Sequence, residues 1–248
     1  TCPVCKSNNM EPYGSGTQKV EEQIPQICPD MSVIRMDIDT TTGKHGHEKI
    51  LNSFKENKID VMVGTQMIAK GHDFPGVTLV GILSADSMLG SGDYRASERT
   101  FQLITQAAGR AGRADKHGRV VLQTFNPDNF SIQCAVKQDY IRFYKQEIEL
   151  RKVLKLPPFF QIGLIQVASK NKDLAMKISK NIHSGIMKNK SLSANLFVSE
   201  PAPSPIAKLR NQYRWRIVLK HQKINSLVNI LKWIYDSYGK SSKREWTI

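Results

Sequence analysis

The sequence predicts an α/β domain, with a parallel sheet covered by helices on both faces, followed by a small ferredoxin-like α+β domain. In the first half of the chain, short apolar strands alternate with amphipathic helices. The pair Pro157-Pro158 then interrupts the chain, and a different order of elements follows it. Strands separated by helices are typical of parallel sheets, because a parallel connection needs a long crossover.

The first domain is predicted from apolar periodicity. Helices are expected where apolar residues recur at helical spacing, over Lys19–Cys28, His47–Asn57 and Glu98–Arg113. Strands are expected at short apolar runs, over Val33–Asp37, Asp60–Val63, Thr78–Ser84 and Arg119–Thr124. A long amphipathic stretch, Ile132–Leu154, ends at the two prolines, which cannot continue a helix. We therefore expect the α/β domain at 13–130, a helical connector at 131–157 and the second domain at 158–248.

The second domain is predicted as βαββαβ, the order of a ferredoxin-like domain. Its strands are expected over Phe160–Ala168, Asn195–Ser199, Tyr213–Lys220 and Arg244–Ile248. Its helices are expected over Lys172–Met187 and Ile224–Tyr238. Between the second and third strands, the run Pro201-Ala202-Pro203-Ser204-Pro205 is expected to form a stiff extended connection.

The charge is concentrated in the C-terminal part of the chain. The whole chain has 36 Lys and Arg against 22 Asp and Glu, a net charge of +14. Residues 156–248 hold 16 of the basic side chains and 4 of the acidic ones. This asymmetry indicates a polyanionic partner such as nucleic acid, although a solvated lysine-rich surface has the same composition. No apolar run approaches a membrane span and no signal pattern is present, so a secreted or membrane protein is not expected.

Two arginines and a glutamine form the sharpest local pattern. Gln106, Arg110 and Arg113 would share one face of a helix at i, i+4 and i+7. Two glycines within a helix cost about 1 kcal/mol each relative to alanine, a cost typical of a close approach by a backbone or a ligand. The guanidinium groups match phosphate oxygens and would stabilise a phosphoryl group in transfer. A small-residue helix packed on a neighbour, with a solvated arginine rim, is the alternative.

Two glycine-containing turns accompany this pattern. The stretch Val63–Phe74 begins where a predicted strand ends, the position at which α/β sheets build ligand sites. Its Thr, Gln and Lys residues suit contacts to a nucleic-acid backbone. The turn Gly14-Ser15-Gly16 leads into a helix, whose first amides suit a phosphate.

These motifs resemble those of superfamily 2 helicases. The string Gln106-Ala107-Ala108-Gly109-Arg110-Ala111-Gly112-Arg113 is similar to motif VI, and Gly64–Asp73 is similar to motif V in the expected order. Other segments resemble the PriA family of primosomal replication-restart helicases in particular: Gly14–Thr17, Lys70–Pro75, Ser84–Leu89, Asp93–Arg99, Pro201–Pro203 and Tyr213–Arg216. This resemblance covers almost the whole chain and implies a RecA-like second helicase lobe at 13–130.

The resemblance also implies roles for individual residues. Arg110 and Arg113, with Gln106 nearby, would reach the γ-phosphate of ATP, which the family uses with Mg²⁺. Gly71 and Asp73 would line the nucleotide side of the cleft. Thr17, Thr65, Gln66 and Lys70 would face the DNA track. In the whole enzyme we expect 3′-to-5′ unwinding at stalled forks and reloading of the replisome. Single-strand-binding protein, primosome proteins and replicative-helicase loaders are the expected partners, in the nucleoid-associated bacterial cytoplasm.

Part of a complete motor is missing from the sequence. It contains neither a P-loop nor an Asp-Glu pair, so we expect this chain alone to be inactive as an ATPase. Cys2 and Cys5 have zinc-ligand spacing, but tetrahedral zinc needs four ligands. The resemblance identifies residues 1–12 as the remnant of a zinc-binding segment, so Zn²⁺ is expected only with upstream cysteines. Cys28 and Cys134 are expected to be buried thiols.

One basic strand completes the candidate sites. Arg214 and Arg216 would lie on one face of the strand and Trp215 on the other, in the core. Arginines on a sheet face suit single-stranded nucleic acid, although they would also be stable when solvated. A non-catalytic nucleic-acid-binding module and a related translocase with another substrate remain alternative functions.

Overall fold

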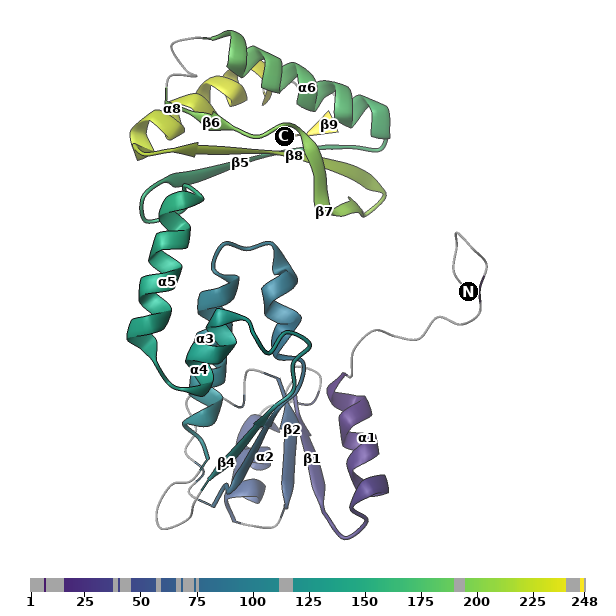
Figure 1. The fold of residues 1–248 in the computed structure, drawn as a ribbon. Coiled ribbons are helices and arrows are strands. Elements are labelled where there is room, and N and C mark those ends of the chain that lie inside the picture. Colours follow the sequence, from purple (N-terminus) through teal and green to yellow (C-terminus); the bar gives the residue numbers. More distant parts are fainter. Residues whose placement is uncertain are drawn as a thin grey trace. The chain divides into compact units, whose positions relative to one another are not determined.

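The computed structural model describes residues 7, 16–37, 40, 46–56, 59–65, 68, 74, 76–111, 118–189, 195–239 and 246–247. The chain forms two compact units, Thr1–Phe143 and Tyr144–Ile248. Figure 1 gives the labels of the elements.

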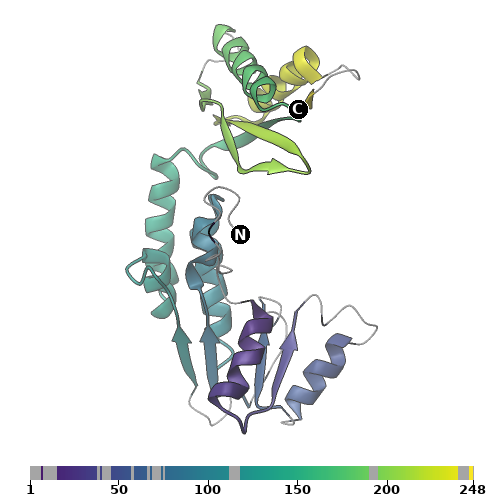
Figure 2. The same ribbon diagram turned by 90° about the vertical axis from the view of Figure 1, so that its right-hand side faces the viewer.

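Unit 1 contains parallel strands and helices, as predicted. Its elements, in chain order, are α1 (Thr17–Ile27), β1 (Val33–Met36), α2 (Gly46–Lys55), β2 (Val61–Gly64), β3 (Leu79–Ile82), the 3₁₀ helix η1 (Ala85–Ser91), α3 (Ala96–Ala108), β4 (Arg119–Leu122) and α4 (Phe130–Val136). Helix α5 (Tyr140–Val153) begins in this unit. β1 pairs in parallel with β2, and β3 pairs in parallel with β4. β1 lies between α1 and α2 in both views (Figure 1, Figure 2).

Each strand pair packs into its own apolar cluster. Met36, Leu51 and Phe74 form the cluster at β1 and β2, where the Phe54 and Phe74 rings meet edge to face at 5.2 Å. A larger cluster joins β3, α3, α4 and the start of α5 through Ile82, Phe101, Ile104, Ile132, Cys134 and Phe143. These clusters hold the ends of the strands in place, because close packing leaves each element little freedom to move.

The predicted amphipathic stretch Ile132–Leu154 is divided into two helices. α4 ends at Val136, and Gln138 then takes a left-handed backbone conformation with φ of 53°. The Asp139 carboxylate accepts a hydrogen bond from the Arg142 amide at 2.9 Å, which caps the start of α5. A left-handed residue followed by a cap starts a new helix direction, and the apolar spacing alone does not reveal this break.

Unit 2 has the predicted ferredoxin-like arrangement. Its elements are β5 (Gln161–Ser169), α6 (Lys172–Lys188), β6 (Phe197–Val198), β7 (Ala202–Leu209), β8 (Gln212–His221), α8 (Ile224–Ile234), the π-helical turn η2 (Tyr235–Gly239) and β9 (Trp246–Thr247). The antiparallel sheet has the order β6-β8-β5-β9. β8 thus lies between the parallel strands β5 and β6, and β5 lies between the parallel strands β8 and β9. Two interlocked split βαβ units of this kind define the fold.

Helices α6 and α8 cover one face of this sheet (Figure 1, Figure 2). Alternate residues of β5 and β8 point into the core with the helices; these are Ile165, Val167, Ile217 and Leu219, all at most 2% exposed. The residues between them lie on the opposite face, which we call the open face. On β8 the open face carries Arg214, Arg216, Val218 and Lys220.

The proline-rich run is a strand of the sheet, where the sequence predicts only an extended connection. Pro203 is paired with Trp215 of β8, and the register then shifts before Lys208 pairs with Tyr213. Proline keeps the extended backbone but donates no hydrogen bond, so it is tolerated where one side of a strand has no partner. β7 is such a strand, because β8 is its one partner among the strands that the structure describes.

We predict that Gly64→Ala destabilises unit 1 by about 1–3 kcal/mol, the usual cost of overpacking a core. A Cβ at Gly64 would collide with the carbonyl oxygen of Met36 on β1 and with the Ile68 side chain. Gly81→Ala on β3 is the matched control, since a Cβ there meets nothing within 4 Å. Urea unfolding followed by circular dichroism measures both. Equal unfolding free energies for the two variants would contradict the close approach at Gly64.

Candidate nucleotide and nucleic-acid sites

The carboxyl ends of β1 and β2 gather polar residues at one edge. Because the strands are parallel and Met36 is paired with Gly64, the residues that follow them, Asp37 and Thr65, emerge at the same edge. Thr17 at the start of α1 joins them, since its hydroxyl donates a hydrogen bond to an Asp37 carboxylate oxygen at 2.7 Å. The ends of three elements thus meet at the position where α/β sheets build ligand sites.

Asp37 is the centre of this edge, and the sequence analysis missed it. Its other carboxylate oxygen, Oδ1, accepts a hydrogen bond from the Thr40 amide at 3.1 Å. The Nε atom of Arg35 lies 3.3 Å from Oδ2, the oxygen that also accepts from Thr17. The hydrogen bond from Thr17, assisted by Thr40 and Arg35, outweighs burial and lowers the pKa of Asp37. The available signal was an acidic residue at the end of an apolar strand. The Thr17 hydroxyl donates to Asp37, and the contact with DNA expected of Thr17 stays a prediction.

The motif V segment is only partly described. Thr65 is exposed, and its carbonyl oxygen accepts a hydrogen bond from the Ile68 amide at 3.1 Å. Phe74 follows and is buried, which fixes the far end of the segment. The remaining candidate residues, Gln66, Lys70, Gly71 and Asp73, lie outside the described residues. Their roles stay predictions.

The motif VI segment differs from its prediction in one respect. α3 ends at Ala108, and Gly109 is its C-cap with φ of −66° and ψ of 0°. The predicted continuation of the helix through Arg113 is wrong, because glycine is a weak helix former and ends helices readily. The turn continues far enough for the Arg110 amide to donate to the Ala107 carbonyl at 3.0 Å. Gln106 is exposed and Arg110 is half-buried, while Arg113 lies outside the described residues.

Aromatic stacking fixes the helix that carries Gln106. The Phe101 ring of α3 stacks on Phe143 of α5 at 4.5 Å, and Phe143 stacks on Phe130 of α4 at 5.8 Å. Ile104 is 2% exposed on the same side of α3. The apolar side of the helix is therefore anchored in the core, and Gln106 is left on its exposed side.

A second edge forms where β3 and β4 end together. The Asp86 carboxylate of η1 accepts hydrogen bonds from the Thr124 hydroxyl at 2.6 Å and from the Phe125 amide at 2.8 Å. The Thr124 bond is the main cause that lowers the pKa of Asp86. The turn into α3 is held similarly, since Asp93 forms ion pairs with Arg95 at 3.3 Å and with Arg99 at 2.9 Å. These bonds fix two segments that the resemblance singled out, Ser84–Leu89 at the end of β4 and Asp93–Arg99 at the start of α3.

The basic strand of unit 2 shows the predicted alternation. Arg214 and Arg216 lie on the open face, whereas Trp215 is half-buried on the core face. The Arg214 guanidinium donates twice to the Ile206 carbonyl, from Nε at 3.0 Å and from Nη2 at 2.7 Å. This carbonyl lies in the part of β7 where the register shifts. Within the described residues, the guanidinium group of Arg216 forms no ion pair or hydrogen bond, so its charge remains available to a ligand.

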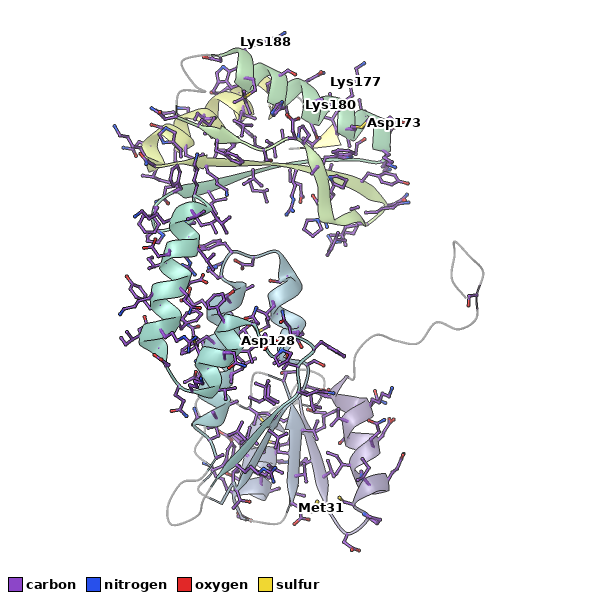
Figure 3. The ribbon with its side chains drawn as sticks, in the orientation of Figure 1. Met31, Asp128, Asp173, Lys177, Lys180 and Lys188 are labelled. Atoms are coloured by element: carbon purple, nitrogen blue, oxygen red, sulfur yellow. The ribbon has the colours of Figure 1, made fainter. Side chains whose placement is uncertain are left out.

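The outer side of α6 is a further basic surface. Lys177, Lys180 and Lys188 point outward from the helix with Asp173 near its start (Figure 3). All four side chains are exposed. Their spacing along α6 places them on one face of the helix.

The described cysteines lie at two helices and differ in burial. Cys134 is buried as predicted, but Cys28 follows the end of α1 as its C-cap and is only half-buried. The predicted position of Cys28 within the helix is therefore wrong by one residue. Cys2 and Cys5 lie outside the described residues, and the described part of the chain contains no group of three or more side chains suited to a metal. Among the same residues, no helix is long and apolar enough to cross a membrane.

Two family models match this combination of units. Residues 13–115 match the helicase conserved C-terminal domain, and residues 152–248 match the primosomal protein N C-terminal domain. The parallel sheets of unit 1 and the order of its motifs agree with the first match, and the antiparallel sheet lies within the second. The chain is thus a second helicase lobe joined to a primosomal C-terminal domain.

Curated relatives from distant bacteria agree with this result. The chain is 42% identical over 245 residues to the replication restart protein PriA of Bacillus subtilis, a match that covers 99% of this chain and 30% of that protein. It is 39% identical over 231 residues to the PriA of Haemophilus influenzae, covering 93% of this chain and 31% of that protein. The chain belongs to the PriA family of replication restart proteins and spans about a third of the length of these relatives.

We predict that Thr17→Val raises the pKa of Asp37. The hydroxyl of Thr17 is the main group that stabilises the ionised carboxylate. The lowered pKa of Asp37 stabilises the fold at pH values above the usual Asp pKa of about 4. This contribution is lost as the pH falls through the pKa of Asp37 in the folded state. The stability difference between Thr17→Val and the parent should therefore be largest at neutral pH and shrink in acid.

Carboxyl-carbon NMR titration and urea unfolding across the acid range measure these changes. Ser32→Ala is the matched control, because the Ser32 hydroxyl is the main group that lowers the pKa of a different residue, Asp60. Each substitution should move only its own carboxylate. An unchanged Asp37 titration in Thr17→Val would contradict the assignment.

Proposed function

We propose that this chain is the C-terminal part of an ATP-dependent DNA helicase that remodels stalled replication forks and reloads the replisome. The observation that carries this proposal is the order of the two family matches in one chain, a helicase C-terminal lobe followed by a primosomal C-terminal domain. The polar edges at the carboxyl ends of the strands in unit 1 support it. So does the positive charge of unit 2, which suits a phosphate backbone.

In this proposal the second lobe binds and neutralises the phosphates of ATP. Arg110 and Arg113 contact the γ-phosphate, and Gln106 lies beside them on the exposed side of α3. Guanidinium groups fit this role because they donate two hydrogen bonds to phosphate oxygens and keep their charge in a partly buried site. Gly71 and Asp73 complete the nucleotide side. ATP with Mg²⁺ supplies the bond that is cleaved, and the P-loop that holds them belongs to another lobe.

DNA contacts are proposed at both units. In unit 1, Thr17, Thr65, Gln66 and Lys70 face the DNA track, and the hydrogen bond from Thr17 to Asp37 holds the start of α1 at this edge. In unit 2, Arg216 binds a phosphate from the open face, and Arg214 keeps the β7–β8 hairpin in place. Cys2 and Cys5 supply two of the four ligands that Zn²⁺ needs, with the other two from upstream cysteines.

The biological setting follows from the same family. We propose 3′-to-5′ movement on DNA, binding to single-stranded and forked DNA, and contacts with single-strand-binding protein, primosome proteins and loaders of the replicative helicase. The protein would act in the bacterial cytoplasm at the nucleoid. A non-catalytic nucleic-acid-binding module is the second candidate, favoured by the absence of a P-loop from the 248 residues. Strand displacement on forked DNA compared with duplex RNA separates a DNA helicase from a related translocase.

We predict that the 248-residue chain alone does not hydrolyse ATP. The gene product with any residues that precede Thr1 should hydrolyse ATP when DNA is present, and Arg113→Ala should slow it by about 10³-fold or more, as loss of an arginine at a transferring phosphoryl group does. Phosphate release is the measurement. Arg99→Ala is the matched control, because Arg99 lies on α3 but is paired with Asp93. DNA-stimulated hydrolysis by the short chain, lost on Arg113→Ala, would overturn the proposal.

We also predict different consequences for the two arginines of β8. Arg216→Ala should weaken binding to single-stranded DNA and reduce the salt dependence by about one phosphate contact, without loss of stability. Arg214→Ala should lower the unfolding temperature, because the Ile206 carbonyl loses both hydrogen bonds. Fluorescence anisotropy and thermal unfolding measure these effects. Lys232→Ala, on the opposite side of the sheet in α8, should change neither. Normal DNA affinity in Arg216→Ala would contradict a role for the open face.

A further inference from the structure

The open face of unit 2 carries a second group of cations that the sequence analysis did not identify. Lys220 lies four residues beyond Arg216 on β8, and directly opposite Phe197 of β6. Its ammonium nitrogen is 5.3 Å from the centre of the Phe197 ring. It also donates a hydrogen bond to the Leu154 carbonyl at the end of α5, at 2.8 Å. Lys220 is thereby held in a fixed position beside an aromatic ring that is 43% exposed.

A second lysine and a second aromatic ring adjoin this position. The ammonium of Lys155 lies 6.0 Å from the centre of the Phe160 ring. Partial burial of Lys220, with the positive charge of Lys155, lowers the pKa of Lys220. Among the described residues, no carboxylate forms an ion pair with either lysine. The two ammonium groups repel each other, and no negative charge in the described part of the chain compensates them. An anion bound between them would therefore be stabilised.

The backbone at Lys155 is a further, independent observation. Lys155 is the second residue after α5 and has φ of 52°, in the left-handed region. Its amide donates to the Lys152 carbonyl at 3.2 Å, and the Leu156 amide donates to the Arg151 carbonyl at 2.8 Å. This is the turn that ends helices at a glycine, because a side chain is strained there. A lysine at this position strains the backbone and places a positive charge near Lys220.

From these observations we propose that Lys155, Lys220, Phe160 and Phe197 form a binding site for one nucleotide unit of a single-stranded nucleic acid. The two ammonium groups bind the phosphodiester, and a base stacks on the exposed Phe197 ring. Aromatic rings beside cations suit this ligand, because every base has a face that can stack. The inference rests on the proposed function, of which it specifies one contact.

A nucleic acid fits better than an acidic peptide because the cations continue along the strand. Arg216 and Lys220 share the open face, and four residues of an extended strand span about 13 Å. An extended chain with evenly spaced negative charges follows such a row. A backbone of phosphates has this property in every sequence, whereas a peptide has it only where acidic residues recur.

The test uses the 248-residue chain, fluorescein-labelled oligothymidylate and fluorescence anisotropy, without ATP. Lys155→Gly should leave stability unchanged or raise it, because glycine accepts the left-handed conformation, and it should weaken binding several-fold with a lower salt dependence. Arg210→Gly is the matched control: Arg210 also has a positive φ, of 49°, but lies in the turn between β7 and β8. It should bind nearly as the parent does. Equal losses in the two glycine variants would overturn the site.

Phe197→Leu tests the stacking contact. It should weaken binding to oligothymidylate about fivefold or more, and should not change binding to an abasic strand of the same length. Equal losses on both strands would overturn the assignment of Phe197. Normal binding of DNA with lost binding of polyaspartate in Lys155→Gly would assign the site to an acidic peptide instead. Failure here leaves ATP hydrolysis by the longer protein unaffected, so the two proposals fail separately.

Discussion

Parallel pairing of short strands is the constraint on which the candidate nucleotide site of unit 1 depends. The pairing places Gly64 against Met36 so closely that only a hydrogen atom fits on the Gly64 Cα. Because Met36 is paired with Gly64, the two parallel strands end together, and the residues that follow them, Asp37 and Thr65, lie at one edge. β3 and β4 repeat this arrangement, with Asp86 bonded to Thr124 at their common edge. Each polar edge is therefore a consequence of strand direction.

Apolar periodicity predicted nearly all of the regular elements, because the spacing of buried side chains records which face of an element meets the core. The ends of elements were harder to predict. Gly109 ends α3 and Gln138 separates α4 from α5 through local backbone preferences that the apolar pattern does not contain. Non-local bonds were beyond reach for a different reason. That Arg214 binds the Ile206 carbonyl depends on a register shift in β7, which no spacing in the sequence reveals.

The sequence likewise predicted some residues of the candidate sites and missed others. Apolar spacing placed Gln106 and Arg110 on one face of a helix that was expected to continue through Arg113. The structure leaves Gln106 on the exposed side of α3 and places Arg110 beyond its end. Asp37 was missed because its position becomes meaningful only when Thr17, twenty residues earlier, donates to it. In unit 2, alternation along β8 predicted which side chains share a face. Lys220 was not selected, since its aromatic neighbour belongs to another strand.

The prolines of β7 have a consequence for many copies of the protein at high concentration. An antiparallel sheet with an unprotected border can recruit the border of a second molecule and grow into an aggregate. Here one border is β9, which has two residues, and the other is formed by β6 and by β7 with Pro203 and Pro205. A two-residue border is too short to template a neighbour, and Pro203 and Pro205 each lack the amide hydrogen that a neighbouring strand would need. Unit 2 can therefore accumulate at high local density while its sheet remains closed to other copies.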